Sequence, residues 1–99
     1  MKVLVIEREV TGVSAADFTP QLKKAEAAHA WELYQSGAIR ELYFRQDQSN
    51  AVLVLECQDG RAARQILEGM PLVEAGLISF EIIPLVAYPG FERLFENKD

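Results

Sequence analysis

The chain has 99 residues, of which 49% are hydrophobic, and a formal net charge of −5. This length suits one domain with a single hydrophobic core. The acidic balance argues against a nucleic-acid partner, because such binding depends on clustered Lys and Arg. The apolar fraction is high for so short a chain and predicts apolar surface left for a partner subunit, so we expect a homo-oligomer of at least two copies.

The cysteine content and the hydropathy of the sequence indicate the cellular compartment of the protein. The single cysteine, Cys57, excludes an internal disulfide framework and a Cys-rich zinc site, and we interpret it as a small buried hydrophobe. The apolar run at residues 3–6 is shorter than the roughly seven residues of a signal sequence or the roughly twenty of a membrane span. We therefore expect a cytoplasmic protein without a membrane partner.

The first half of the chain predicts a strand, a helix and a second strand. The apolar run at residues 3–6 is typical of a strand buried on both faces. Residues 20–36 are rich in Ala, Glu, Leu and Lys, with Pro20 suited to a first helical turn and Gly37 to a helix end. Residues 39–46 alternate in polarity as a strand does.

The second half predicts a strand, a helix and a fourth strand. Residues 47–50 are a polar turn, and residues 51–57 are an apolar third strand. Asp59 is a good N-cap for a helix through Glu68. Gly69 and Pro71 then form a stop signal, with Gly69 expected in the left-handed cap conformation.

The last part of the sequence predicts a fourth strand followed by a tail. Gly76 precedes the apolar residues 77–85, in which Pro84 must lie near the strand's end or on a sheet edge. The tail carries Phe91, Leu94 and Phe95 at one-turn spacing. We expect a short helix at about residues 90–99 that docks on the domain, because these side chains would otherwise be exposed.

The element order βαββαβ predicts an α+β, ferredoxin-like domain over residues 1–99, with two helices on one face of an antiparallel sheet. Strands one, three and four are apolar on both faces, so a sheet-to-sheet dimer is expected to cover the open face. An RNA-binding domain has the same element order but needs exposed aromatics on strands one and three, which this chain lacks.

Two ionisable residues fall on the inner face of the first helix. Helical spacing places Glu26 and His29 on the same face, whereas Trp31 falls on the opposite side. An ionised Glu26 on an inner face is costly, which predicts a raised pKa or a partner. Such a carboxylate suits a general base, and His29 a second acid/base, so Glu26 and His29 are the predicted catalytic residues.

The alternative for this face is structural. In that interpretation Glu26 reaches the rim and pairs with Lys23 or Arg45, while His29 is a core histidine whose hydrogen bonds are satisfied.

The second strand supplies two candidate substrate-binding residues. If its polar face looks at the first helix, Tyr43 can donate to a substrate oxygen and Arg45 can hold a carboxylate bidentately. If Leu42 and Phe44 look inward instead, Tyr43 and Arg45 belong to a dimer face or to solvent. Periodicity alone leaves both arrangements open.

Motifs for other chemistries are absent from the sequence. It contains no Gly-rich phosphate loop, no nucleophile elbow and no metal-spaced His/Asp cluster. We expect neither a metal nor a cofactor, and a small molecule as the ligand.

Two stretches carry a resemblance to a known family. LEGMPLVEAGLISFEIIPLVAYP, at residues 67–89, resembles the muconolactone delta-isomerase-like family of dimeric α+β barrels, with its Leu-Pro-Leu turn and its strand ending in Pro-Leu. Met70 stands where the family has the first Leu. KKAEAAHAWELYQSG, at residues 23–37, is similar to the family's first helix, with Glu26 at a corresponding place. The resemblance implies a ferredoxin-like fold, oligomerisation and a small-molecule pocket.

The leading functional hypothesis is therefore a small oligomeric enzyme resembling muconolactone isomerases. It would isomerise a small unsaturated carboxylate or lactone, with Glu26 moving the proton. The alternatives are a non-catalytic dimeric barrel that binds a small apolar ligand or a partner, and, on fold analogy alone, a cofactor-free monooxygenase-like barrel.

Overall fold

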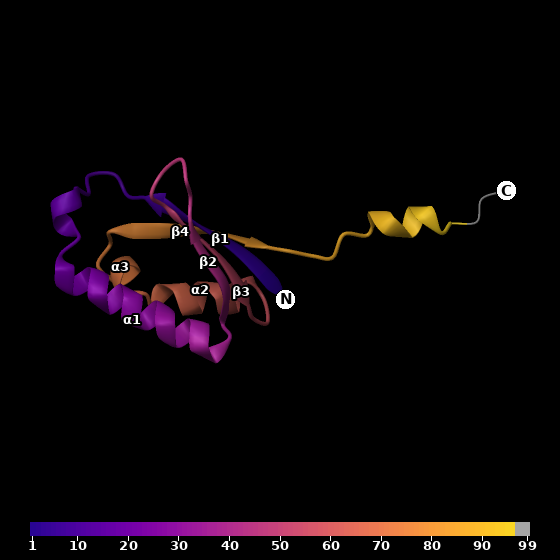
Figure 1. The fold of residues 1–99 in the computed structure, drawn as a ribbon, viewed down its shortest axis with the longest axis horizontal. Helices are drawn as coiled ribbons and strands as arrows, with labels where there is room; N and C mark the ends of the chain where they lie inside the picture. Colours follow the sequence, from indigo (N-terminus) through magenta and orange to yellow (C-terminus); the bar gives the residue numbers. More distant parts are fainter. Residues whose placement is uncertain (97–99) are drawn as a thin grey trace.

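The computed structural model describes residues 1–96, which form a four-stranded antiparallel sheet with its helices on one side (Figure 1). The strands are β1 (Lys2–Glu9), β2 (Ile39–Phe44), β3 (Ala51–Glu56) and β4 (Ile78–Pro84). The α-helices are α1 (Pro20–Ser36), α2 (Gly60–Glu68) and α3 (Pro71–Glu74), and two 3-10 helices are η1 (Ala15–Asp17) and η2 (Gly90–Leu94). The strand order β2-β3-β1-β4 confirms the predicted ferredoxin-like α+β fold.

The core lies between the sheet and the helices. Val3 pairs with Leu55 and Val5 with Leu53 across β1 and β3, and each of these four side chains is at most 1% exposed. Because side chains alternate along a strand, these residues define the inner face of the sheet. Helix α1 packs on the β2 side of this face and α2 on the β4 side.

The helix limits follow from local sequence signals. The Thr19 hydroxyl accepts a hydrogen bond from Leu22 N at 3.2 Å and caps α1, with Pro20 at its first position. Gly37 ends α1 in the left-handed region, with φ +86°. At α2, the Asp59 carboxylate accepts from Ala62 N at 2.8 Å. The predicted starts and ends of both helices are confirmed.

The connection from α2 to β4 differs from the prediction. Gly69 has φ −80° and ψ −6°, so the expected left-handed cap at this residue is wrong. The chain continues into the short helix α3 at Pro71 instead of reversing at Gly69, and Gly76 adopts the positive φ of +75°. Strand β4 ends at Pro84 on the sheet edge, as predicted.

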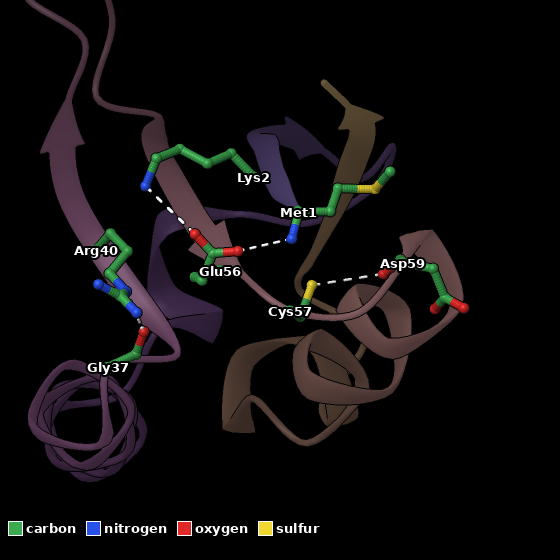
Figure 2. Close-up of polar contacts among 7 residues, drawn as sticks. All are labelled: Met1, Lys2, Gly37, Arg40, Glu56, Cys57 and Asp59. Carbon is green, nitrogen blue, oxygen red and sulfur yellow. Dashed lines mark hydrogen bonds and ion pairs between the residues drawn. The ribbon is translucent and has the colours of Figure 1, made fainter. Parts of the chain in front are cut away.

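Polar contacts tie the start of β1 to the end of β3 (Figure 2). The N-terminal ammonium lies 2.7 Å from one Glu56 carboxylate oxygen, and Lys2 Nζ lies 3.5 Å from the other. The ammonium's hydrogen bond holds the pKa of Glu56 below its ordinary value. The Cys57 thiol donates to the Asp59 carbonyl at 3.4 Å and packs against the core while staying partly exposed.

The tail leaves the domain as an arm (Figure 1). A turn of helix forms at Gly90–Leu94, but the expected docking on the domain is wrong, because Phe91, Leu94 and Phe95 are 66%, 75% and 83% exposed. The arm continues outward from the edge strand β4 (Figure 1). The last three residues of the predicted tail lie outside the described residues.

Within residues 1–96, no helix combines the length and the apolar character that crossing a membrane requires.

Candidate functional site

A cavity of about 490 Å³ opens between the inner face of the sheet and helix α1. Its walls are mostly apolar, with Leu53 and Phe80 from the sheet and the small side chains of Ala27 and Ala30 from α1. Larger residues at the two alanine positions would fill this space. The volume lies in the range of small-molecule sites, which run from about 300 to 1,000 Å³.

Three charged residues line the cavity: Glu7 from β1, and Lys23 and Glu26 from α1. Glu7 comes from the sheet, whereas Lys23 and Glu26 come from the first half of α1. An apolar pocket with a few convergent charged groups is the usual form of a site that binds and orients a small ligand.

Glu26 is partly buried in the cavity wall. Leu72 N, in α3, donates a hydrogen bond to Glu26 Oε1 at 3.0 Å. Burial raises the pKa of Glu26 above its ordinary value of 4.5, and the charge of Glu7 adds to this rise. The Leu72 hydrogen bond and the charge of His29 act in the opposite direction but do not cancel the rise. A carboxyl group with a raised pKa exchanges a proton more readily near neutral pH.

Glu7 is the third charged residue that lines the cavity. The pairing of β1 with β3 runs to Ile6 opposite Val52, and Glu7 Oε1 then accepts from Ala51 N at 3.0 Å. The buried Asn50 side chain donates to the Glu7 carbonyl at 3.4 Å. The Ala51 bond holds the Glu7 carboxylate, and the Asn50 bond holds the Glu7 backbone.

Sequence reasoning missed Glu7 as a site residue and considered Lys23 only as a rim partner of Glu26. The signal for Glu7 was the alternation with Val3 and Val5, which places it on the same inner face. The predicted strand ended at Ile6, where the apolar run stops, so Glu7 was not included in the inner face.

His29 shares the inner side of α1 with Glu26, as predicted, but is not among the residues lining the cavity. Its Nε2 atom lies 3.7 Å from the position that a Cβ on Gly69 would occupy, so the ring packs against the α2–α3 connection. Glu26 forms no ion pair with Lys23 or Arg45 in the described part of the chain. Glu26 therefore lines the cavity, whereas His29 does not.

The register of β2 settles which of its faces looks at the helices. Leu42 lies opposite the buried Leu53 and Phe44 opposite Ala51, so Leu42 and Phe44 are on the inner face. Tyr43 therefore directs its side chain to the outer face, although the residue borders the cavity at its rim.

The polar ends of Tyr43 and Arg45 are engaged outside the cavity. The Tyr43 hydroxyl donates to Glu41 at 2.8 Å, and this bond raises the pKa of Tyr43. Arg45 binds the Asp47 carboxylate bidentately, at 2.9 and 2.6 Å, and is not among the residues lining the cavity. The structure does not bring these two groups together with Glu26.

No group of three or more His, Cys, Asp or Glu residues within residues 1–96 is arranged to hold a metal ion.

The fold and the cavity define a small ferredoxin-like protein with a carboxylate-lined, mostly apolar pocket. A model of the muconolactone delta-isomerase family matches residues 6–90. The chain therefore belongs to this family.

Two solved structures share the fold. A muconolactone isomerase crystal structure superimposes with a TM-score of 0.71 at 23% identity, covering 90% of this chain and 92% of that one. The 5-chloro-2-hydroxyhydroquinone dehydrochlorinase TftG from Burkholderia phenoliruptrix AC1100, in complex with 2,5-dihydroxybenzoquinone, gives a TM-score of 0.63 at 16% identity, covering 91% and 98%. No curated protein matches the chain significantly.

Proposed function

We propose that the cavity binds a small unsaturated lactone or carboxylate and that Glu26 moves a proton between two of its carbons. The observation that carries this proposal is the position of Glu26, a partly buried carboxylate with a raised pKa in the wall of an apolar cavity. Membership of the muconolactone delta-isomerase family supports the reaction type, since that name denotes a shift of a double bond.

The proposed reaction needs one base and no other reactant. The ionised Glu26 takes the proton from a saturated carbon α or γ to the unsaturated carbonyl, and the C–H electron pair delocalises towards the carbonyl oxygen as a dienolate. The protonated Glu26 then returns the proton to the carbon at the other end of the conjugated system, and the double bond moves by one position. Glu26 ends the cycle ionised, so atoms and charge balance.

The surroundings of Glu26 suit this role. Leu72 N–H holds Oε1, and Oε2 has no hydrogen-bond partner among the described residues, so Oε2 is the oxygen available to the substrate. Lys23 also lines the cavity, and its positive charge would attract a substrate carboxylate or the dienolate oxygen. The apolar walls limit water around these charges and strengthen their interaction.

His29 and Glu7 would shift the pKa of Glu26 without contacting the substrate carbons. The charge of His29 lowers the pKa of Glu26, and the charge of Glu7 raises it. We therefore assign His29 a positioning role behind Glu26. Tyr43 and Arg45 have no step in this mechanism, because their polar groups bind Glu41 and Asp47.

The test is turnover of muconolactone, followed by proton NMR, with Glu26→Gln as the variant. Glutamine keeps an oxygen for Leu72 N–H but cannot accept the proton, so turnover should fall by about 10²–10⁴-fold. Glu32→Gln, an exposed glutamate on the same helix, is the matched control and should retain activity. Equal turnover in Glu26→Gln and the wild type would refute the role of Glu26.

Binding without catalysis is the second candidate function. The Leu72 hydrogen bond gives Glu26 a structural task, which favours this alternative. Titration with 2,5-dihydroxybenzoquinone, the ligand of the TftG complex, measures binding separately from turnover. Quinone binding by a wild-type protein that turns over no muconolactone would favour the binding function.

We also propose that the protein forms a homodimer through the outer face of its sheet. This face carries five apolar side chains that no helix covers (Figure 1): Leu4, Ile6, Val52, Val54 and Ile83. Apolar faces of this kind are usually covered by a partner. Light scattering at micromolar concentration should give at least twice the chain mass of 11.1 kDa, and a monomer would contradict the assignment.

We propose that the protein is located in the cytoplasm. The partly exposed free thiol of Cys57 suits a reducing environment, in which single cysteines stay unpaired. Cell fractionation would test it, and recovery outside the cytoplasm would contradict it.

A further inference from the structure

A second cavity adjoins the one that contains Glu26. It has a volume of about 690 Å³ and lies where β1 leads into η1 and where β2 turns into β3, with Glu9, Ser14 and Ser49 in its walls. We call it the β1-end cavity. Five residues line both cavities: Glu7, Lys23, Phe44, Leu72 and Ile78. The two cavities are therefore continuous, and one ligand can extend from the first into the second.

The two cavities differ in polarity. The walls around Glu26 are mostly apolar, whereas the β1-end cavity is lined by more polar and charged groups. The inner face of β1 shows this change directly, because the buried Val3 and Val5 are followed on the same face by Glu7 and Glu9. A ligand that fills both cavities needs an apolar part at one end and a polar part at the other.

Two oxygen acceptors at the β1-end cavity have no hydrogen-bond partner within residues 1–96. Asn50 is only 8% exposed, and its Nδ2 donates to the Glu7 carbonyl at 3.4 Å, but its Oδ1 accepts from no described group. Glu7 Oε1 accepts from Ala51 N at 3.0 Å, which leaves Glu7 Oε2 as the second such acceptor.

The Asn50 oxygen is accessible from the β1-end cavity. No fully enclosed side-chain nitrogen or oxygen of the described residues lacks a partner, so Asn50 Oδ1 is not sealed in the protein. The cavity that Asn50 lines gives access to it. Buried polar groups are nearly always hydrogen-bonded, so an acceptor of this kind favours a ligand that brings a donor.

We infer that the β1-end cavity binds a hydroxyl group of the ligand and that Glu7 and Asn50 select for it. A hydroxyl can donate to Glu7 Oε2 or Asn50 Oδ1, and it can accept from the Lys23 ammonium, which lines the same cavity. A carboxylate cannot donate and would be repelled by Glu7 and Glu9. An ammonium cannot accept and would be repelled by Lys23.

This inference narrows the substrate class, and it rests on the proposed function for the reacting part of the ligand. An unsaturated lactone would occupy the apolar cavity beside Glu26, and a hydroxyalkyl substituent of the same molecule would enter the β1-end cavity. The Ala51 hydrogen bond fixes one oxygen of Glu7, so the other has a defined place where the two cavities meet. Glu7 and Asn50 bind the substituent and take no part in the proton transfer.

Binding of three unsaturated lactones tests this inference. They are butenolides with a hydroxyethyl, a propyl or a methoxyethyl group on the ring carbon next to the ring oxygen. Isothermal titration calorimetry measures each dissociation constant. The hydroxyethyl compound should bind the wild type about 10–100-fold more tightly than the propyl compound, which has the same shape but no donor. The methoxyethyl compound can only accept, so it should bind no better than the propyl compound.

Glu7→Gln is the variant that tests the assigned acceptor. Glutamine keeps an oxygen for Ala51 N but places an NH₂ group where Glu7 Oε2 was, so a donor replaces an acceptor. The preference for the hydroxyethyl over the methoxyethyl compound should fall by about tenfold. Glu32→Gln, an exposed glutamate that lines neither cavity, is the matched control and should keep the preference.

NMR of the wild type locates the hydroxyl without any substitution. The signals of the Asn50 side-chain amide should shift more when the hydroxyethyl compound binds than when the propyl compound binds. Equal shifts would place the hydroxyl elsewhere and overturn the inference.

Three results of the titrations would also overturn it. These are equal binding of the hydroxyethyl and propyl compounds, no binding of any of the three compounds at millimolar concentration, and a hydroxyl preference that Glu7→Gln leaves unchanged.

The failure of this inference is distinguishable from the failure of the proposed reaction. Glu26 does not line the β1-end cavity, so Glu26→Gln should keep the hydroxyl preference while it loses turnover of muconolactone. Loss of turnover in this variant without any hydroxyl preference in the wild type would support the reaction and refute the hydroxyl site. A hydroxyl preference with unchanged turnover in Glu26→Gln would refute the reaction and support the hydroxyl site.

Discussion

Glu7 takes part both in the pairing of β1 with β3 and in the lining of the cavity. Its carboxylate replaces the next pairing between β1 and β3 by accepting from Ala51 N, and it also faces the cavity with Glu26. Replacing Glu7 with alanine leaves a partly buried N–H group without its partner. Replacing it with glutamine keeps an acceptor oxygen and removes only the charge.

The magnitudes of the two substitutions should therefore differ. The hydrogen bond is to a charged acceptor but only partly buried, so Glu7→Ala should reduce the free energy of unfolding by about 1–2 kcal/mol. Glu7→Gln should cost less than about 1 kcal/mol, because a neutral hydrogen bond remains. Both substitutions should lower the pKa of Glu26, since the charge of Glu7 raises it.

Urea unfolding measures the first effect, and carbon NMR titration of the glutamate carboxyl groups measures the second. Glu9→Gln, an exposed glutamate on the same strand, is the control and should change neither quantity. Equal destabilisation by Glu7→Gln and Glu7→Ala would refute the role of the hydrogen bond. An unchanged pKa of Glu26 in both variants would refute the electrostatic coupling.

Three further predictions concern stability. Gly37→Ala should reduce the free energy of unfolding in urea by about 1–2 kcal/mol, because φ at this position is +86°. The new Cβ would meet nothing closer than 3.9 Å, so the cost is conformational. An unchanged free energy of unfolding would contradict this. Leu55→Ala, at a fully buried position, should cost about 2–5 kcal/mol, and less than 1 kcal/mol would refute its place in the core. Folded Glu26 binds its proton more tightly than the unfolded chain, so the wild type should lose stability as pH rises from 4.5 through the raised pKa. Thermal melting should show this loss reduced in Glu26→Gln, and an equal loss in both proteins would contradict it.

The fold was predictable because its signals are local. Pro20, Gly37 and Asp59 each mark a helix end through their own backbone or side-chain chemistry, and all three act as predicted. The inner face of α1 followed from helical periodicity, which correctly separated Glu26 from Trp31. The order of these elements then left few alternatives to the ferredoxin-like topology.

The rest of the candidate site depends on contacts that no single segment encodes. Which face of β2 looks inward is decided by its pairing with β3, where Leu42 meets Leu53, and not by the alternation of β2 itself. The place of Glu7 depends on a hydrogen bond to Ala51, 44 residues further along the chain. The tail was expected to dock because it is apolar, but apolarity does not specify which surface covers it.

We propose that turnover requires the ionised form of Glu26, so protonation of Glu26 at low pH removes the base. The most direct test of this proposal is kcat/KM for muconolactone as a function of pH, measured beside the NMR titration of the Glu26 carboxyl group. We predict that activity rises with pH at the same midpoint at which Glu26 ionises, and that this midpoint lies above 4.5. An activity profile that does not follow the ionisation of Glu26, or a Glu26 pKa at or below 4.5, would contradict the account.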